Sequence, residues 1–261
     1  MAYTVGSLFS GIGGFELGFE RAGFDVRWQV EIDPFCRAVL AKHWPEVARY
    51  DDVRTCGAAN LEPVDVVCGG FPCQPVSLAG RRKAQADDRW LWPEFARVLR
   101  ELRPRIAALE NVPGLLVHGL EDVLGDLAAI GYDAEWDCVS AADVGANHRR
   151  ERVWILAYAN VAGLEGRHGG ELRERAGEQP ARTCGALADA NGEGQLQQGG
   201  FVGEEWRRAG DGRGWWRTEP DVGRVAHGIP ARMDRLRALG NAIVPQVAEV
   251  IARRVRALLE V

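Results

Sequence analysis

The sequence contains little lysine and no excess of positive charge. Its 261 residues include 32 lysines and arginines, but Lys42 and Lys83 are its two lysines, and the formal net charge is −5. A globally basic surface is therefore excluded, and any nucleic-acid binding has to come from local patches. The preference for arginine agrees both with a bias in genome composition and with phosphate recognition.

Metal-cluster spacings and long apolar runs are also missing. The six cysteines contain no CxxC pair, so they indicate neither a zinc cluster nor a disulfide framework, and we expect no metal. Unpaired thiols are typical of the reducing cytoplasm, where we expect this protein. The N-terminus has no charged segment followed by a long apolar stretch, so we expect no signal peptide and no membrane span.

Strand and helix patterns alternate along most of the chain. Short apolar runs predict strands at 5–9, 26–32, 64–68, 106–109, 134–139 and 153–158. Amphipathic patterns predict helices at 15–22, 34–43, 90–102, 120–130 and 244–259. The alternation predicts an α/β fold with a doubly wound, mainly parallel sheet, in which ligands bind at the carboxyl ends of the strands.

The alternation stops after about residue 158, which divides the chain into three parts. Residues 1–158 form the expected catalytic and cofactor-binding domain, and the helix of 217–261 is expected to return to it. Residues 159–216 are rich in Gly, Arg, Glu and Gln and have little apolar periodicity. They are interpreted either as a disordered linker or as a small recognition insert that becomes ordered on binding its target.

Three segments of the first part suggest a nucleoside site. The glycines of "LFSGIGG" allow a ligand to approach the backbone where a strand turns into a helix, although a plain tight turn has the same pattern. Glu31, at the end of the second strand, is placed to accept hydrogen bonds from ribose hydroxyls, or else it caps the next helix as Asp33 can. Asp52 is a third carboxylate, which could accept a hydrogen bond from an adenine amino group. Because the spacing is not GxGxxG and no basic residue is near, we expect an adenosine-containing ligand without a pyrophosphate.

A second group of residues has the chemistry of a catalytic site. Cys73 lies between Pro72 and Gln74 in "GGFPCQP", directly after a buried strand, so the thiol is presented rather than packed. Glu110 ends another strand, where desolvation favours its neutral form and makes it a proton donor. Arg150 and Arg152 alternate before the last strand, so an extended backbone would place both on one face. A solvated charge run is the alternative interpretation of the arginines.

These segments together resemble the DNA (cytosine-5)-methyltransferase family of bacterial or phage type. The resemblance rests on "FSGIGG", "EIDP", "DDV", "GGFPCQPVSLAG", "ENVPG", "NHRRER" and "RALGNAIVPQVA", and covers nearly everything outside 159–216. It implies a Rossmann-like class I fold, S-adenosylmethionine as methyl donor, and methylation of a cytosine flipped out of DNA. It further implies Cys73 as nucleophile, Glu110 at N3 of the base, Arg152 at O2, and Arg150 as support for the loop.

The same resemblance implies binding residues for the donor and for DNA. The donor pocket would be lined by Phe9, Gly11, Ile12, Gly13, Gly14, Glu31, Ile32, Asp52, Val53, Gly70, Phe71, Pro72, Leu91, Asn241 and Ala242. Ile32 replaces the aromatic residue that often stacks on adenine in this family. DNA contacts are expected from Gln74, Ser77, Arg81, Arg82, Lys83, Arg207, Arg208 and Arg217.

The expected partners are double-stranded DNA and, if the gene belongs to a restriction-modification pair, a companion restriction endonuclease. The chain is expected to act as a monomer and to recognise a short site. Two alternatives stay open from the sequence: a tRNA cytosine-5 methyltransferase with the same catalytic residues, and a cofactor-binding regulator without catalysis. An oxidoreductase is disfavoured by the glycine spacing.

Overall fold

A seven-stranded sheet forms the centre of the computed structural model, which describes residues 2–72, 90–160 and 231–260. The strands are β1 (Thr4–Leu8), β2 (Asp25–Val30), β3 (Ala48–Tyr50), β4 (Val66–Gly69), β5 (Ile106–Asn111), β6 (Tyr132–Val139) and β7 (Arg152–Ala159). Their order in the sheet is β3-β2-β1-β4-β5-β7-β6. β7 is antiparallel to both of its neighbours, and the other pairings are parallel. The prediction of a mainly parallel, doubly wound sheet is confirmed.

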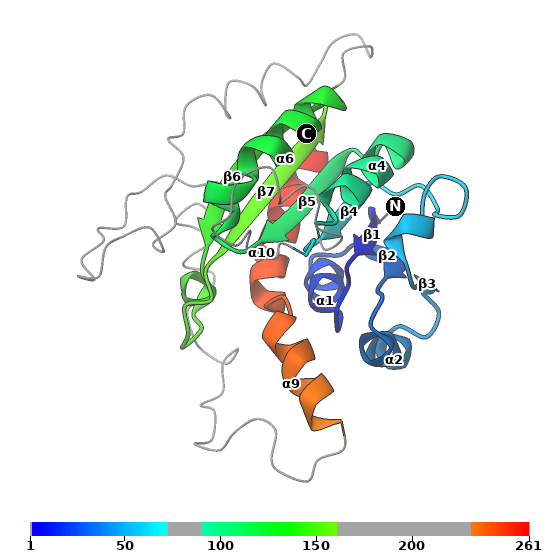
Figure 1. Cartoon of the computed structure of the whole chain (residues 1–261), viewed down its shortest axis with the longest axis vertical. Helices are drawn as coiled ribbons and strands as arrows, with labels where there is room; N and C mark the ends of the chain where they lie inside the picture. Colours follow the sequence, from blue (N-terminus) through cyan, green and yellow to red (C-terminus); the bar gives the residue numbers. More distant parts are fainter. Residues whose placement is uncertain (1, 73–89, 161–230, 261) are drawn as a thin grey trace, which may run out of the picture.

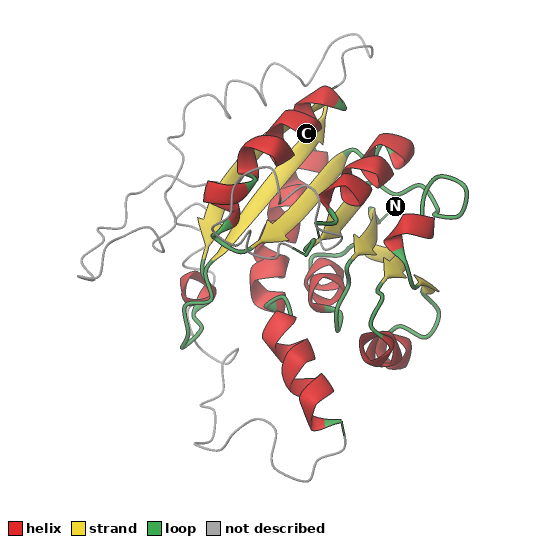
Figure 2. Cartoon of the chain, viewed as in Figure 1, coloured by secondary structure: helices red, strands yellow, loops and turns green. Residues whose placement is uncertain are grey.

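Helices cover both faces of this sheet (Figures 1 and 2). They are α1 (Gly14–Arg21), α2 (Pro34–His43), α4 (Trp92–Leu102), α5 (Leu115–His118), α6 (Leu120–Ala129), α9 (Arg232–Asn241) and α10 (Pro245–Leu259), with the 3₁₀ turns η1 (Val53–Thr55) and η2 (Ala141–Val144). One apolar cluster joins α1 and α10 to the sheet, and a second joins α4 and α6 to the opposite face. Strands between two such layers are apolar on both sides, which explains the continuous apolar runs of the sequence.

Two local sequence signals agree closely with the elements they predicted. Pro34 is the first residue of α2, and the Asp33 side chain accepts hydrogen bonds from the backbone N–H groups of Phe35 (2.8 Å) and Cys36 (3.3 Å). Glycine has no Cβ, which lets α1 approach its neighbour: a Cβ on Gly18 would lie 2.5 Å from the Cβ of Ala248 in α10. The chain after residue 231 therefore packs directly on the first helix.

Three sequence expectations differ from the structure. β3 and α9 were not predicted, because β3 has three residues and α9 has a weak apolar face. Cys36, Cys56 and Cys68 are free thiols, but Cys138 is in a disulfide, so the expectation of unpaired thiols is wrong at that residue. Spacing along the chain does not reveal which sulfur atoms meet in space.

The structure leaves the predicted insert undescribed but bears on the expectation of no membrane span. Residues 161–230, and with them nearly all of the predicted insert at 159–216, lie outside the described residues, so the three-part division of the chain stays a prediction. Among the described residues, none of the helices has the length and apolar character that a membrane crossing requires.

Candidate active site

The turn after β1 has an unusual backbone that glycine makes possible. Gly11 and Gly13 have φ values of 57° and 92°, and Phe9 also has a positive φ of 55°. A Cβ on Gly14 would lie 2.5 Å from the carbonyl oxygen of Ile243, so the loop before α10 closes directly over the start of α1. Ile12, between these glycines, is partly exposed. The glycines of "SGIGG" thus serve both backbone shape and close packing.

Glu31 is held beside this turn by two backbone groups. Its carboxylate oxygens accept hydrogen bonds from the N–H of Gly11 and the N–H of Asp33, each at 2.7 Å. The residue is 9% exposed, and each carboxylate oxygen keeps a lone pair for a further donor. Glu31 is therefore not the cap of α2, because Asp33 has that role. We call residues 9–13 with Glu31 and Ile32 the glycine-loop site.

Ile32 gives this site an open apolar surface. The residue is 62% exposed, although it lies only two positions after Val30, the buried end of β2. Arg37 fixes the backbone here by donating from Nη1 to the carbonyl oxygens of Glu31 (3.0 Å) and Ile32 (2.7 Å). An exposed aliphatic side chain beside a fixed carboxylate matches the two halves of adenosine, a flat base and a ribose with two hydroxyls.

Three residues expected in the donor pocket make contacts within the protein. The Asp52 side chain caps η1 by accepting the N–H of Arg54 at 3.0 Å, and it also lies 3.6 Å from the Arg54 guanidinium. Val53 is buried in the core, so its side chain is not available to a ligand. Phe71 is also buried, where it packs against Trp90 and other aromatic rings. At Val53 and Phe71, ligand contacts are limited to the backbone.

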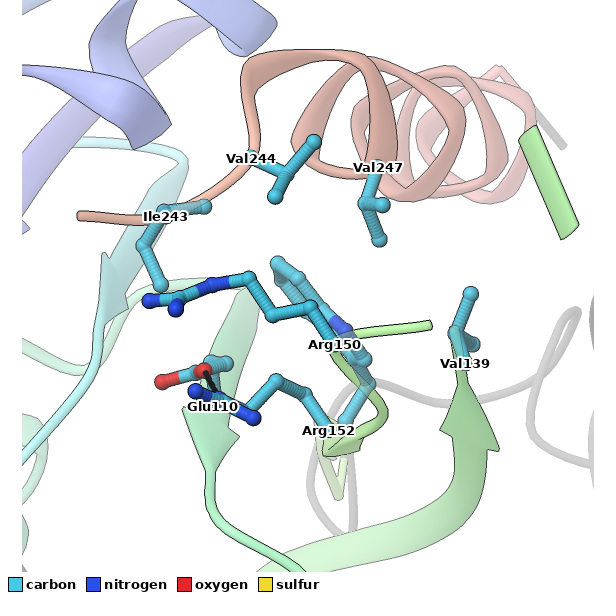
Figure 3. A pocket seen from close by; sticks show the side chains of 8 residues that line it. Glu110, Val139, Arg150, Arg152, Ile243, Val244 and Val247 are labelled. Atoms are coloured by element: carbon cyan, nitrogen blue, oxygen red, sulfur yellow. Dashed lines mark ion pairs between the residues drawn. The ribbon is translucent and has the colours of Figure 1, made fainter. Parts of the chain in front are cut away.

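Glu110 lies at the end of β5, away from the glycine-loop site on β1 and β2 (Figure 3). Burial raises its pKa to about 7, and the charges of Arg152 and Arg150 oppose that rise. Arg152 Nε lies 3.0 Å from Glu110 Oε1. A carboxyl group with this pKa exchanges a proton near neutral pH, as a general acid must. We call Glu110, Arg150 and Arg152 the glutamate–arginine site.

Arg150 differs from Arg152 in backbone and in partners. Its φ of 39° is left-handed and β7 begins only at Arg152, so the predicted extended segment is wrong at Arg150. Both arginines nevertheless line the same pocket as Glu110, together with Val139, Trp154, Ile243, Val244 and Val247. Arg150 Nη2 donates to the carbonyl oxygens of Gly240 (2.8 Å) and Ala242 (2.7 Å).

These two hydrogen bonds connect the glutamate–arginine site to the segment at 240–242. That segment contains Asn241 and Ala242, two of the residues expected in the donor pocket. Asn241 is the last residue of α9 and is exposed. Arg237 of the same helix lies 2.6 Å from Asp33, next to the glycine-loop site. The C-terminal segment therefore contacts both sites.

Asn111 is a residue that the sequence argument did not select. It is buried, its Nδ2 donates to the carbonyl oxygen of Phe71 at 3.1 Å, and its Oδ1 accepts the N–H of Val112 at 2.8 Å. It thereby fixes the backbone just before Pro72. A Cβ on Gly70 would lie 2.8 Å from Glu110 Oε2, so glycine is needed for that close approach. The sequence signal that could have identified Asn111 was its position beside Glu110 in "ENV".

Glu16 is the second residue that was missed. It is 1% exposed on α1, and burial raises its pKa to about 7. No sequence signal distinguishes it from an exposed carboxylate on an amphipathic helix.

Of the remaining expected site residues, Leu91 lies within the described part of the chain. Leu91 is the N-cap of α4 and is partly exposed. Cys73, Gln74, Ser77, Arg81, Arg82, Lys83, Arg207, Arg208 and Arg217 lie outside the described residues. Within the described ranges, no group of three or more His, Cys, Asp or Glu side chains is placed to hold a metal ion.

The strand order, with an antiparallel β7 and a glycine turn after β1, is that of a class I S-adenosylmethionine-dependent methyltransferase with a Rossmann-like fold. Within this class, residues 3–193 match the C-5 cytosine-specific DNA methylase family, and the chain belongs to that family.

Two curated relatives illustrate the match. The Type II methyltransferase M.NgoMIV of Neisseria gonorrhoeae is 35% identical over 165 residues, which cover 61% of this chain and 53% of the relative. M.HhaI of Haemophilus parahaemolyticus is 30% identical over 163 residues, covering 60% of this chain and 50% of the relative. The chain thus spans about half the length of these relatives.

Solved structures share the fold. A putative DNA modification methyltransferase encoded within a prophage of E. coli has a TM-score of 0.63 and 21% identity, covering 100% of both chains. The Entamoeba histolytica methyltransferase EhMeth has a TM-score of 0.64 and 15% identity, covering 99% of both chains.

Proposed function

We propose that this protein is a DNA (cytosine-5)-methyltransferase that transfers a methyl group from S-adenosylmethionine to C5 of a flipped-out cytosine. The observation that carries the proposal is Glu110, a largely buried carboxyl group whose side chain is 12% exposed and whose pKa is about 7, paired with Arg152 and fixed beside the backbone that leads into Cys73. Membership of the C-5 cytosine-specific DNA methylase family supports it.

The methyl donor would bind at the glycine-loop site. Glu31 is oriented by the N–H groups of Gly11 and Asp33 and has lone pairs left for the ribose hydroxyls. Ile32 offers an aliphatic face to adenine. When bound, S-adenosylmethionine supplies a methyl group on a positively charged sulfur, and the protein needs no metal for this transfer.

The cytosine would be activated at the glutamate–arginine site. The thiolate of Cys73 adds to C6, and the electron pair of the C5–C6 bond becomes available at C5 to take the methyl group. Glu110 protonates N3 during this addition, and Arg152 bonds O2 of the base. The C5 proton then leaves to a base, its electron pair reforms the C5–C6 bond, Cys73 departs as thiolate, and the N3 proton returns to Glu110.

These steps require a base that has left the duplex, since C6 and N3 are covered or paired within stacked DNA. The partner is accordingly double-stranded DNA, with phosphate contacts from Arg81, Arg82 and Lys83 and further contacts from the 159–216 insert. The designation of the relatives as Type II methyltransferases supports a companion endonuclease of a restriction-modification pair. A monomer in the cytoplasm is the form in which we expect the enzyme to act.

Bisulfite sequencing of DNA from cells that express the protein tests the activity directly. We expect methylated cytosines at one short recurrent site, and none in cells that express Cys73→Ser. A covalent complex between purified protein and DNA containing 5-fluorocytosine tests the mechanism, because the fluorine at C5 cannot leave as a proton does. The same fluorinated base in RNA is the control, and trapping on RNA alone would contradict the proposal.

A further inference from the structure

Glu16 lies in a buried polar cluster directly beneath the glycine-loop site. The cluster consists of Glu16 on α1, Ser7 on β1, Ser10 in the loop and Gln29 on β2, and all four are at most 4% exposed. Ser10 Oγ lies 3.0 Å from Ser7 Oγ and 3.3 Å from the Ser7 carbonyl oxygen. Polar groups this deeply buried destabilise a fold unless they are hydrogen-bonded.

Acceptors and a donor in this cluster both lack hydrogen-bond partners. Neither carboxyl oxygen of Glu16 has a hydrogen-bond partner, and neither does Gln29 Nε2. The Ser7, Ser10 and Gln29 side chains face the carboxyl closely enough to lower its pKa, but burial dominates and raises it to about 7. A neutral acid has both a donor and an acceptor to share with these groups, whereas a buried carboxylate without a cation is costly.

The loop at residues 9–13, above the cluster, is held in its conformation by contacts with neighbouring segments. Phe9 is in a left-handed conformation that costs free energy for a residue with a Cβ. Glu31 supports the loop from one side through the N–H of Gly11. Ser10 supports it from the other side: its N–H donates to Val30 O at 3.1 Å, its carbonyl accepts Gly13 N–H at 3.0 Å, and its hydroxyl enters the cluster.

We propose that Glu16 is a positioning residue for the methyl donor. Glu16 acts through Ser10 to hold the loop at residues 9–13 in the conformation that binds the donor. The proposal rests on the proposed function, because it assumes that S-adenosylmethionine binds at that loop. Glu16 works as the neutral acid, and its ionisation releases the loop and weakens donor binding.

Other charged groups near α1 leave Glu16 as the titrating member of the cluster. Cys68 on β4 faces Glu16, but burial raises its pKa well above the ordinary value, so the thiol stays protonated. Arg49 of β3 bonds to Gln29 Oε1 at 3.0 Å and reaches the cluster only through that amide. Glu249 of α10 is paired with Arg21 and Arg253.

The test is calorimetry of S-adenosylhomocysteine binding to the full chain without DNA, from pH 6 to pH 8. Relative to Glu16→Gln, which is neutral at every pH, the wild-type protein should lose about tenfold in affinity between pH 6 and pH 8. At pH 6 the two proteins should bind alike. Glu16→Leu should bind about tenfold more weakly at every pH, since it replaces the carboxyl group that faces the buried amide and hydroxyls with an apolar side chain.

Each outcome decides the question. Identical pH profiles of wild type and Glu16→Gln would overturn the role of Glu16, and so would tight binding by Glu16→Leu. If Glu16→Leu fails to fold, the wild-type and Glu16→Gln profiles decide alone. Absence of any binding by the wild-type protein would instead overturn the proposed donor site, and this inference with it.

Discussion

Glu16 is buried and Glu110 is largely buried, and the two glutamates have the same raised pKa in different surroundings. Burial raises the pKa of each to about 7. Glu110 ends a strand and faces Arg152 and Arg150, while Glu16 lies within a helix and faces hydroxyls and an amide. The difference teaches that a raised pKa alone does not identify a catalytic group: a mobile proton is useful for chemistry only where it faces a substrate pocket.

The largest expected effect is at the glutamate–arginine site, where Cys73 is proposed to act. Cys73→Ser should lower turnover by at least about 10⁴-fold, because the hydroxyl is a far weaker nucleophile than a thiolate. Donor affinity at the glycine-loop site should be unchanged, as calorimetry can show. Cys36→Ala, which removes a buried thiol of α2, is the control and should keep full turnover.

Glu110→Gln should lower kcat by about 10²- to 10⁴-fold, the usual range for a lost general acid. In the wild type, kcat/KM should fall as the pH rises above about 7, where Glu110 loses its proton. The variant should lack that fall. Glu16→Gln is the matched comparison, and a comparable loss of kcat at saturating donor would show that the two carboxyl groups are not functionally different.

The two glutamates should also differ in stability. A carboxyl group whose pKa is near 7 when folded and near 4.5 when unfolded makes the protein less stable as the pH rises from 4.5 to 7, after which the loss is constant. Over this range, the free energy of unfolding of Glu16→Gln should rise relative to wild type by up to about 3 kcal/mol. Glu110→Gln should gain less, since Arg152 loses its counter-ion. Urea unfolding at several pH values measures both, and equal gains would remove the distinction.

Glu31→Ala should weaken donor binding by about 1.5–3 kcal/mol, the scale of a lost charge-assisted hydrogen bond. The change also frees the N–H groups of Gly11 and Asp33, so the effect should appear in donor affinity more than in kcat at saturation. Glu46→Ala, an exposed acid, serves as control. Unchanged affinity in calorimetry would rule out the ribose contact.

The smallest effect is expected at the surface of the glycine-loop site. Arg237→Met removes an ion pair with Asp33 in which the arginine side chain is 62% exposed. Exposed pairs contribute about 0.2–1 kcal/mol, so donor affinity should fall by fivefold at most and less at high salt. A larger, salt-independent loss would mean that α9 has a structural role in the site beyond this pair.

Much of the fold was predictable because its signals are local. Strands between two helical layers are continuously apolar, and Pro34 with Asp33 marks the start of α2. β3 escaped because three residues are too few for a periodic pattern, and α9 because its exposed leucines and arginines carry little amphipathic signal. The disulfide at Cys138 has no signature in spacing.

The sequence by itself determined the order of the elements, the glycine turn, and the strand ends at which Glu31 and Glu110 stand. These follow from short-range patterns and from the geometry of a parallel sheet. The tertiary structure alone decided that Asn111 holds the carbonyl of Phe71 and that Arg150 binds carbonyls 90 residues further along the chain. It also decided that Glu16 is buried. Such contacts and desolvation depend on which distant segments meet, and no local pattern encodes that.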